Sequence, residues 1–257
     1  MSDLEVQPVA EPAPGPAGMS QIQRVTSIFS APSKTFDDIK RGNTSWWMPW
    51  LIMVVVSYLL FAVVVSKVGM QTVVDNQMKL MSESQQEQMA KAPPAQREMS
   101  AKISLYITEG VFLASPVLVL LIAAIVAVVL WGTINFVFGG KARFGSVFAV
   151  WFFANLPSVI KTLLGIVVIY AGGTPETFNI KNYAPTNVGA FLPVMETNKA
   201  LYAFASSMDA VTIWSLILMS IGLAAVAGVK RSAGYVAVFG WWLIIVLWGV
   251  GVAAVMG

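Results

Sequence analysis

Five long apolar stretches constrain the fold of this chain more than any other feature of its sequence. A bilayer core of about 30 Å is crossed by a helix of about 20 apolar residues. Inside lipid, a single spanning segment satisfies its own backbone hydrogen bonds only as a helix. The stretches cover residues 47–65, 111–138, 144–170, 201–229 and 235–256. The sequence therefore predicts an all-α polytopic membrane protein with a five-helix transmembrane bundle.

The composition supports this class and excludes several kinds of site. Hydrophobic residues make up 57% of the 257 residues and charged residues 11%, against roughly 25% charged in soluble proteins. Cysteine and histidine are both absent, which excludes disulfides, zinc or haem held by these residues, and imidazole-based triads. The net charge of +3 is small and spread along the chain, so we expect no nucleic-acid partner. We also expect no catalytic residues, no metal site and no cofactor.

The amino-terminal region divides into two parts. Residues 1–20 are polar and rich in proline, and we expect them to be disordered because they can bury little apolar surface. Residues 21–42 form an amphipathic segment, which Pro32 is expected to split into two short helices. Such a segment can lie on an anionic membrane surface. Alternatively, it packs on the protein's own membrane helices, and the sequence leaves both readings open.

The two longer connections differ in character. No proline or glycine interrupts residues 71–92, which are good helix formers. Pro93 and Pro94 then end that helix, so residues 66–110 are predicted to form a helical hairpin that extends spans one and two outward. The connection 171–200 is rich in glycine and proline and is predicted to be irregular.

The charges of the loops predict an orientation. The short connections carry Lys141 and Arg143, and Lys230 and Arg231, and the amino-terminal region is also basic. Basic residues close to span ends favour the cytoplasmic side. We therefore expect a cytoplasmic amino terminus and an extracytoplasmic carboxyl terminus, with both longer connections outside.

Two charged residues within the expected spans form a candidate intramembrane ion pair. Lys161 lies about 14 Å below the outer end of span three, and Asp209 about 12 Å below the outer end of span four, at 1.5 Å per residue. Consecutive antiparallel spans are usually neighbours, so these matching depths predict a contact. The pair could act as a gate or a cation-responsive element. It could equally be structural, or the lysine could extend toward the outer interface.

Four further positions in spans two and three are candidates for polar contacts or a kink. Asn135 and Asn155 could line a polar cavity or hydrogen-bond between helices. Pro157 is expected to kink span three, because it frees a backbone carbonyl. Ser158 precedes Lys161 by three residues on the same helical face, and a serine–lysine dyad can act as a nucleophile. Nothing nearby in the sequence indicates an oxyanion hole.

Three stretches resemble the Yip1 family of five-span membrane proteins, particularly its bacterial branch. They are FSAPSKTF at residues 29–36, the block from GSVFAVW to NLP at 145–157, and the run from DAVTIWSL to IGLAA at 209–225. The resemblance implies a five-span fold and a non-enzymatic role. Eukaryotic relatives act in vesicle trafficking with small GTPases of the Rab type, but their aspartate-leucine-tyrosine-glycine-proline signature is absent here. The family offers no catalytic residues to transfer.

These observations favour a non-enzymatic membrane scaffold, or an accessory subunit of a transport or envelope complex, in which the 66–110 hairpin docks a partner. Membrane lipids and a membrane-protein partner or a second copy are the expected contacts. The alternative is a small transporter or channel with a polar path near Lys161 and Asp209. A membrane hydrolase using Ser158 and Lys161 is the third reading. From the resemblance to the bacterial branch, the lack of a lipidation or retention signal and the absence of cysteine, we expect the chain to lie in a bacterial inner membrane.

Overall fold

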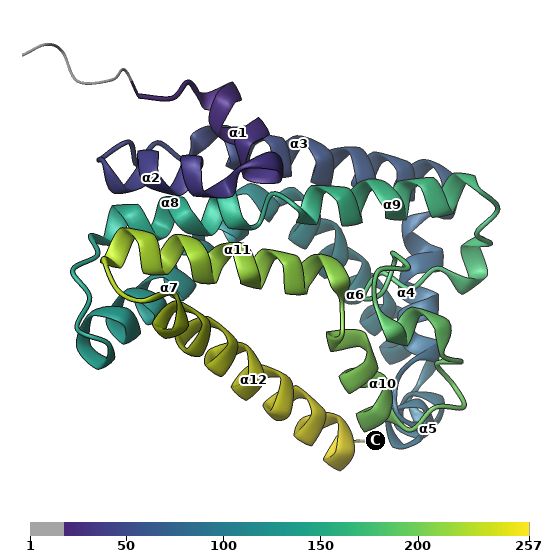
Figure 1. Ribbon diagram of the computed structural model, residues 1–257. Coiled ribbons are helices and arrows are strands. Elements are labelled where there is room, and N and C mark those ends of the chain that lie inside the picture. The colour runs from purple at the N-terminus through teal and green to yellow at the C-terminus, as the bar shows by residue number, and fades with distance from the viewer. Residues whose placement is uncertain (1–17, 257) are drawn as a thin grey trace, which may run out of the picture.

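The computed structural model describes residues 18–256, which fold entirely into helices, turns and loops with no β-strand in that range (Figure 1). Five segments are long and apolar enough to cross a membrane, as the sequence predicts. They are Trp47–Val68, Ser115–Val137, Phe144–Tyr170, Ala210–Ala227 and Arg231–Val255. The prediction of disorder for residues 1–20 falls mostly outside the described residues.

Three of the five spans are composites of two helical pieces. The first two spans end in π-helical turns, and the third is broken at residues 155–157, where Pro157 is expected to kink it. The pieces are α3 (Trp47–Val63) with η1 (Val64–Val68), α7 (Ser115–Gly132) with η2 (Thr133–Val137), and α8 (Phe144–Ala154) with α9 (Ser158–Tyr170). The last two spans are α11 (Ala210–Ala227) and α12 (Arg231–Met256).

The fourth span begins later than the sequence suggested. The expected start was at residue 201, but residues Lys199–Ser207 form a separate helix, α10, and α11 begins at Ala210. The side chain of Asp209 accepts a hydrogen bond from the backbone N–H of Thr212. An aspartate in this position satisfies one of the free donors of a helix start, so the chain turns into a new helix there.

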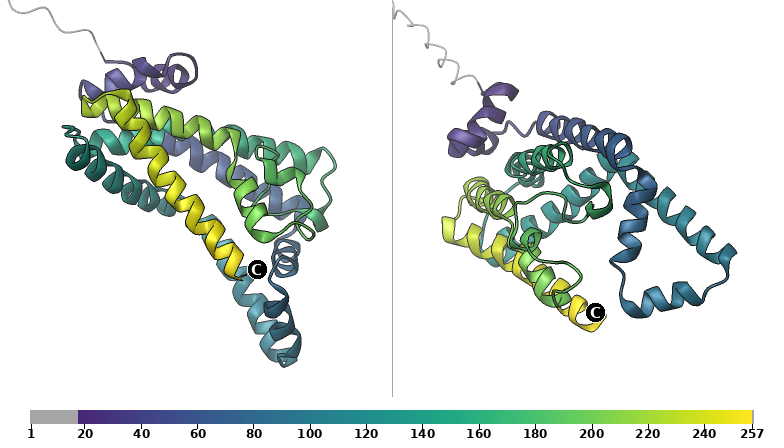
Figure 2. Two further views of the ribbon diagram at one scale, coloured as in Figure 1. Left: turned by 60° about the horizontal axis from the view of Figure 1, so that its bottom comes forward. Right: turned by 90° about the vertical axis from the view of Figure 1, so that its right-hand side faces the viewer.

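The connection between spans one and two contains three helices where two were expected. They are α4 (Met70–Lys79), α5 (Glu83–Lys91) and α6 (Pro94–Leu113). The predicted helix over residues 71–92 is broken because Ser82 and Gln85 form a capping box that starts α5. Figure 2 shows the result as a triangle of helices that stands away from the spans. Val73 and Val74 of α4 are buried.

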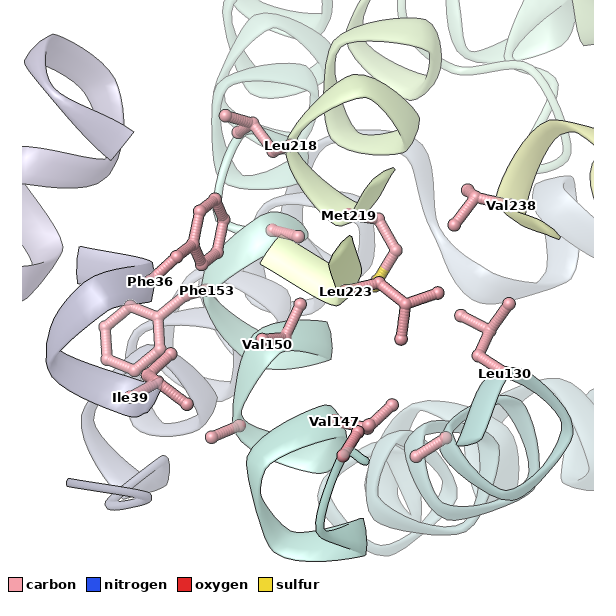
Figure 3. Packing of buried hydrophobic residues seen from close by; sticks show 14 of the residues in the cluster. Phe36, Ile39, Leu130, Val147, Val150, Phe153, Leu218, Met219, Leu223 and Val238 are labelled. Atoms are coloured by element: carbon pink, nitrogen blue, oxygen red, sulfur yellow. The ribbon is translucent and has the colours of Figure 1, made fainter. Parts of the chain in front are cut away.

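The amino-terminal segment packs on the protein's own membrane helices, which was the second of its two readings. Pro32 separates α1 (Gln21–Ser30) from α2 (Pro32–Lys40), as predicted. Ile28, Phe36 and Ile39 are almost completely buried in the main core. Figure 3 shows Phe36 and Ile39 beside Phe153 of α8, with Leu218 of α11 nearby.

The last span is held close to its neighbours at its start and then diverges. A β-carbon added at Gly234 would clash with the backbone oxygen of Ser220 and lie 3.0 Å from the Ala224 Cβ. Only glycine permits this approach of α12 to α11. Further along, the Trp241 indole N–H donates to Thr133 Oγ1 at 2.9 Å, and α10 packs against α12. In Figure 1, α12 leaves α11 at an angle, and this divergence makes room for the cavity described below.

Candidate functional site: an ion pair beside an intramembrane cavity

The structure brings Lys161 and Asp209 together. Lys161 Nζ lies 2.9 Å from Asp209 Oδ2. The Asp209 side chain is 3% exposed and the Lys161 side chain 24% exposed. The contact joins α9 of the third span to the residue that caps α11 of the fourth.

The Asp209 carboxylate is held by three donors from three parts of the chain. Besides Lys161, the Thr186 hydroxyl donates to Oδ2 at 2.6 Å and the Thr212 backbone N–H donates to Oδ1 at 2.8 Å. The positive end of the α11 dipole also favours a negative charge at this place. Thr186 was not found by the sequence analysis, since it lies in the connection 171–200 and no local pattern links it to Asp209.

Part of the connection 171–200 reaches the ion pair. Its backbone bonds to the start of α11, with Ala210 N donating to Thr186 O at 2.9 Å, and Asn187 is paired with Asp209 in an isolated bridge. The Asn187 side chain is buried and caps the short turn η4 (Val188–Phe191). Irregular backbone at such a depth is tolerated where protein covers it and satisfies its polar groups. The irregular connection is therefore part of the site.

A cavity of about 250 Å³ lies between the second, third, fourth and fifth spans. One wall, formed by the third and fourth spans, carries all the polar residues of the lining. These are Asn155, Ser158, Lys161, Thr212 and Ser215, and the apolar Trp151, Val211, Leu216 and Met219 lie among them. The facing wall is apolar and aromatic, and includes Val126, Leu130, Val238, Trp241, Trp242 and Ile245. The structure thus places the predicted polar residues of span three along one side of an amphipathic cavity.

The other predicted positions have structural contacts. Asn135 does not line the cavity: its Nδ2 donates to Ala142 O at 3.0 Å, and its Oδ1 accepts from Ala142 N at 2.9 Å, which closes the loop after span two. Asn155 Nδ2 donates to Trp151 O within its own helix. Lys161 Nζ donates to Asp209 Oδ2, whereas the base of a serine–lysine dyad must be directed at the serine hydroxyl. The ion pair therefore weighs against the hydrolase reading.

The structure contains a second buried ion pair, which was not predicted from the sequence. Arg24 is 0% exposed, and its Nε lies 3.3 Å from Asp38 Oδ2. The guanidinium also donates to Asn43 Oδ1 at 3.3 Å, to Asn43 O at 2.7 Å and to Ser45 O at 2.7 Å. Burial lowers the pKa of Arg24 to about 10, and the nearby Asp38 carboxylate opposes that shift. Arg24 thus stays charged at neutral pH. It links α1 to α2 and to Asn43 and Ser45, which precede span one.

This cluster also attaches the amino-terminal helices to the third span. The Arg24 guanidinium lies over the Phe153 ring, 4.3 Å from its centroid. One signal for it was present in the sequence. Arg24 precedes the buried Ile28 by four residues, and residues four apart share a helix face. A charge on an otherwise apolar face indicates a buried partner.

The spans, the buried ion pair and the cavity define a multi-pass integral membrane protein of the all-helical class. The Yip1 domain model matches residues 26–253, and the chain belongs to this family. The match begins within α1 and includes α2 and nearly all residues of the five spans. No curated protein and no solved structure matches the chain. Among residues 18–256, no three metal-ligating side chains of the histidine, cysteine or carboxylate type lie together.

Proposed function

We propose that this Yip1-domain protein is a non-enzymatic accessory subunit that docks another membrane protein through α6. The observation that carries the proposal is an exposed apolar stripe. No residue of α6 is buried, and Met99, Ile103, Tyr106 and Ile107 are 63%, 49%, 69% and 60% exposed. Their spacing of three to four residues places them on one side of the helix.

The position of the stripe favours a partner that is itself in the membrane. The helix α6 leads directly into the second span, where Val117, Leu121 and Ile125 are also exposed. The apolar surface therefore continues from the connection into the span. A soluble partner would cover only the first part, whereas a partner with a membrane helix and an outer extension covers both. Large exposed apolar surfaces outside lipid usually mark interaction sites.

We also propose that the chain lies in a bacterial inner membrane with its amino terminus in the cytoplasm and α4 to α6 outside. Two basic loops support this orientation, because they meet at one end of the bundle. Lys141 N, in the loop after span two, donates to Ala227 O, just before Lys230 and Arg231. The helices α1 and α2 pack on α8 and α11, whose ends carry these loops.

A cysteine introduced at Tyr106 tests the docking role and the orientation together, because the chain has no other cysteine. In intact spheroplasts, an impermeant maleimide–succinimidyl cross-linker is expected to react with Tyr106→Cys from outside and to capture one membrane protein in stoichiometric amount. Adding Ile103→Gln and Ile107→Gln removes apolar contact and is expected to reduce capture by at least about tenfold, since hot-spot residues are worth about 2 kcal/mol or more each. Quantitative mass spectrometry of the adducts provides the measurement.

The matched control adds Arg97→Gln and Glu98→Gln to the same cysteine variant. Both residues are exposed on α6 but outside the apolar stripe, so capture should be retained. Equal capture by the stripe variant and the control would contradict the docking role. A reaction only after the membrane is permeabilised would contradict the orientation. Capture of a second copy of this chain would replace the partner subunit by a homo-oligomer.

The cavity favours a second candidate, a small transporter or channel with a path beside Lys161. Its polar wall runs along α9 and the start of α11, where Asp209 anchors the lysine. Purified protein in proteoliposomes should then conduct an ion or solute, and Lys161→Met should remove that flux. Lys67→Met, which removes a cation at the end of the first span, is the control. Absence of flux for a panel of inorganic ions and small metabolites would reject this candidate.

A further inference from the structure

The cavity beside the ion pair has the features of a site for an amphiphile. Its hydroxyl, amide and ammonium groups all come from the third and fourth spans, where apolar side chains lie among them, whereas α7 and α12 contribute only aliphatic and indole side chains. A purely polar solute would leave the aromatic wall without contacts. A purely apolar chain would leave the remaining donors of Lys161 and the hydroxyls that line the cavity without partners, which is costly in a membrane.

The charge that faces the cavity is positive. Lys161 lines the cavity, whereas Asp209 lies behind it and is 3% exposed. The Asp209 oxygens already accept from Lys161, Thr186 and Thr212. An ammonium has three donors, and in the described part of the chain Asp209 accepts one of those of Lys161. The remaining donors can bind an anionic oxygen inside the cavity.

The cavity is not fully enclosed, and two of its lining residues on α12 are exposed. Trp241 and Ile245 line it and are 40% and 65% exposed on the span surface. Figure 1 shows α12 diverging from α11 beyond their close contact at Gly234. A molecule already dissolved in the bilayer can therefore enter from the side. The volume of about 250 Å³ is below the roughly 300–1,000 Å³ of typical ligand pockets, so one chain fits better than two.

We propose that this cavity binds one acyl chain of a membrane amphiphile, whose anionic oxygen is held by Lys161. The chain lies against Trp241, Trp242 and Ile245, and the hydroxyls of Ser158 and Thr212 are available to the head group. Two sources share this chemistry, a free long-chain fatty acid and an anionic phospholipid that inserts one of its chains. The proposal goes beyond the docking role of α6 and does not depend on it.

Quenching of tryptophan fluorescence tests the site, since Trp151, Trp241 and Trp242 line the cavity. The full chain is purified in a non-ionic detergent and titrated with dibromostearic acid, with the corresponding dibrominated alcohol, and with dibrominated phosphatidylglycerol and phosphatidylcholine. We expect saturable quenching by the acid and little by the alcohol. Saturation by phosphatidylglycerol as well assigns the site to a lipid head group, and saturation by the acid alone assigns it to a free fatty acid.

Three variants make the outcome specific. Lys161→Met should weaken binding of the acid by at least about tenfold, because it removes a charged hydrogen bond, whereas Lys67→Met should leave the affinity unchanged. Ser215→Phe fills the cavity and should abolish saturable quenching without removing a charge. Equal binding of the acid and the alcohol, equal binding of phosphatidylcholine and phosphatidylglycerol, or unchanged binding in Ser215→Phe would overturn the proposal. Loss of partner capture in the α6 variants, together with normal tryptophan quenching, would contradict the docking role and would support the acyl-chain site.

Discussion

Replacing Asp209 with alanine is expected to lower the free energy of unfolding by about 3 kcal/mol. The change leaves Lys161 without its counter-ion, and breaking a buried pair typically costs about 3–5 kcal/mol. The lower end applies because the Lys161 side chain is 24% exposed and its ammonium can turn away. Alanine also removes the cap of α11 and the acceptor of Thr186. Thermal unfolding in a mild detergent measures the effect.

The stability recovered by two double variants distinguishes the contribution of the ion pair from that of the helix cap. Lys161→Met combined with Asp209→Asn removes both charges, while the asparagine oxygen can still accept from Thr212 N. This variant is expected to regain most of the lost stability. Lys161→Met with Asp209→Leu should recover less, because leucine cannot cap α11 or bind Thr186. Identical melting temperatures for the two double variants would show that the cap contributes nothing, and no recovery in either would argue against the pairing.

Replacing Arg24 with methionine is expected to lower the free energy of unfolding by about 3–5 kcal/mol. The change removes the counter-ion of the Asp38 carboxylate, whose side chain is 3% exposed. The variant also frees the Asn43 and Ser45 carbonyls that Arg24 binds. The helices α1 and α2 should then separate from α8, because Arg24 also packs on Phe153. Limited proteolysis should cut residues 40–46 faster in the variant, and the melting temperature should fall.

Two comparison variants identify the cause of that loss. Lys40→Met removes the same charge from an exposed position of α2 and should change neither proteolysis nor melting. Arg24→Lys keeps the charge but loses the planar fork that reaches several acceptors at once, so it should recover only part of the stability. If Arg24→Met melted like Lys40→Met, the cluster would have no role in attaching the amino-terminal helices.

The ion pair shows how far sequence reasoning reaches and where it goes wrong. Lys161 and Asp209 were paired because both were expected at a similar depth in neighbouring spans. The structure contains that contact, yet the placement of Asp209 inside the fourth helix was wrong, since α11 begins at Ala210 and not at residue 201. Asp209 is a helix cap at the end of a descending loop. The cap could have been read from the sequence, whereas Thr186 could not, because 23 residues separate it from Asp209.

The sequence by itself determined the five membrane helices, the split at Pro32 and the break near Pro157. Each of these follows from local chemistry: apolar length, helical hydrogen bonding within one segment, and the missing N–H of proline. The tertiary structure alone decided where Arg24 finds its acceptors, how the 171–200 connection reaches Asp209, and that α12 diverges to leave a cavity. Those features depend on contacts between residues far apart in the chain, and the packing of several helices at once selects them.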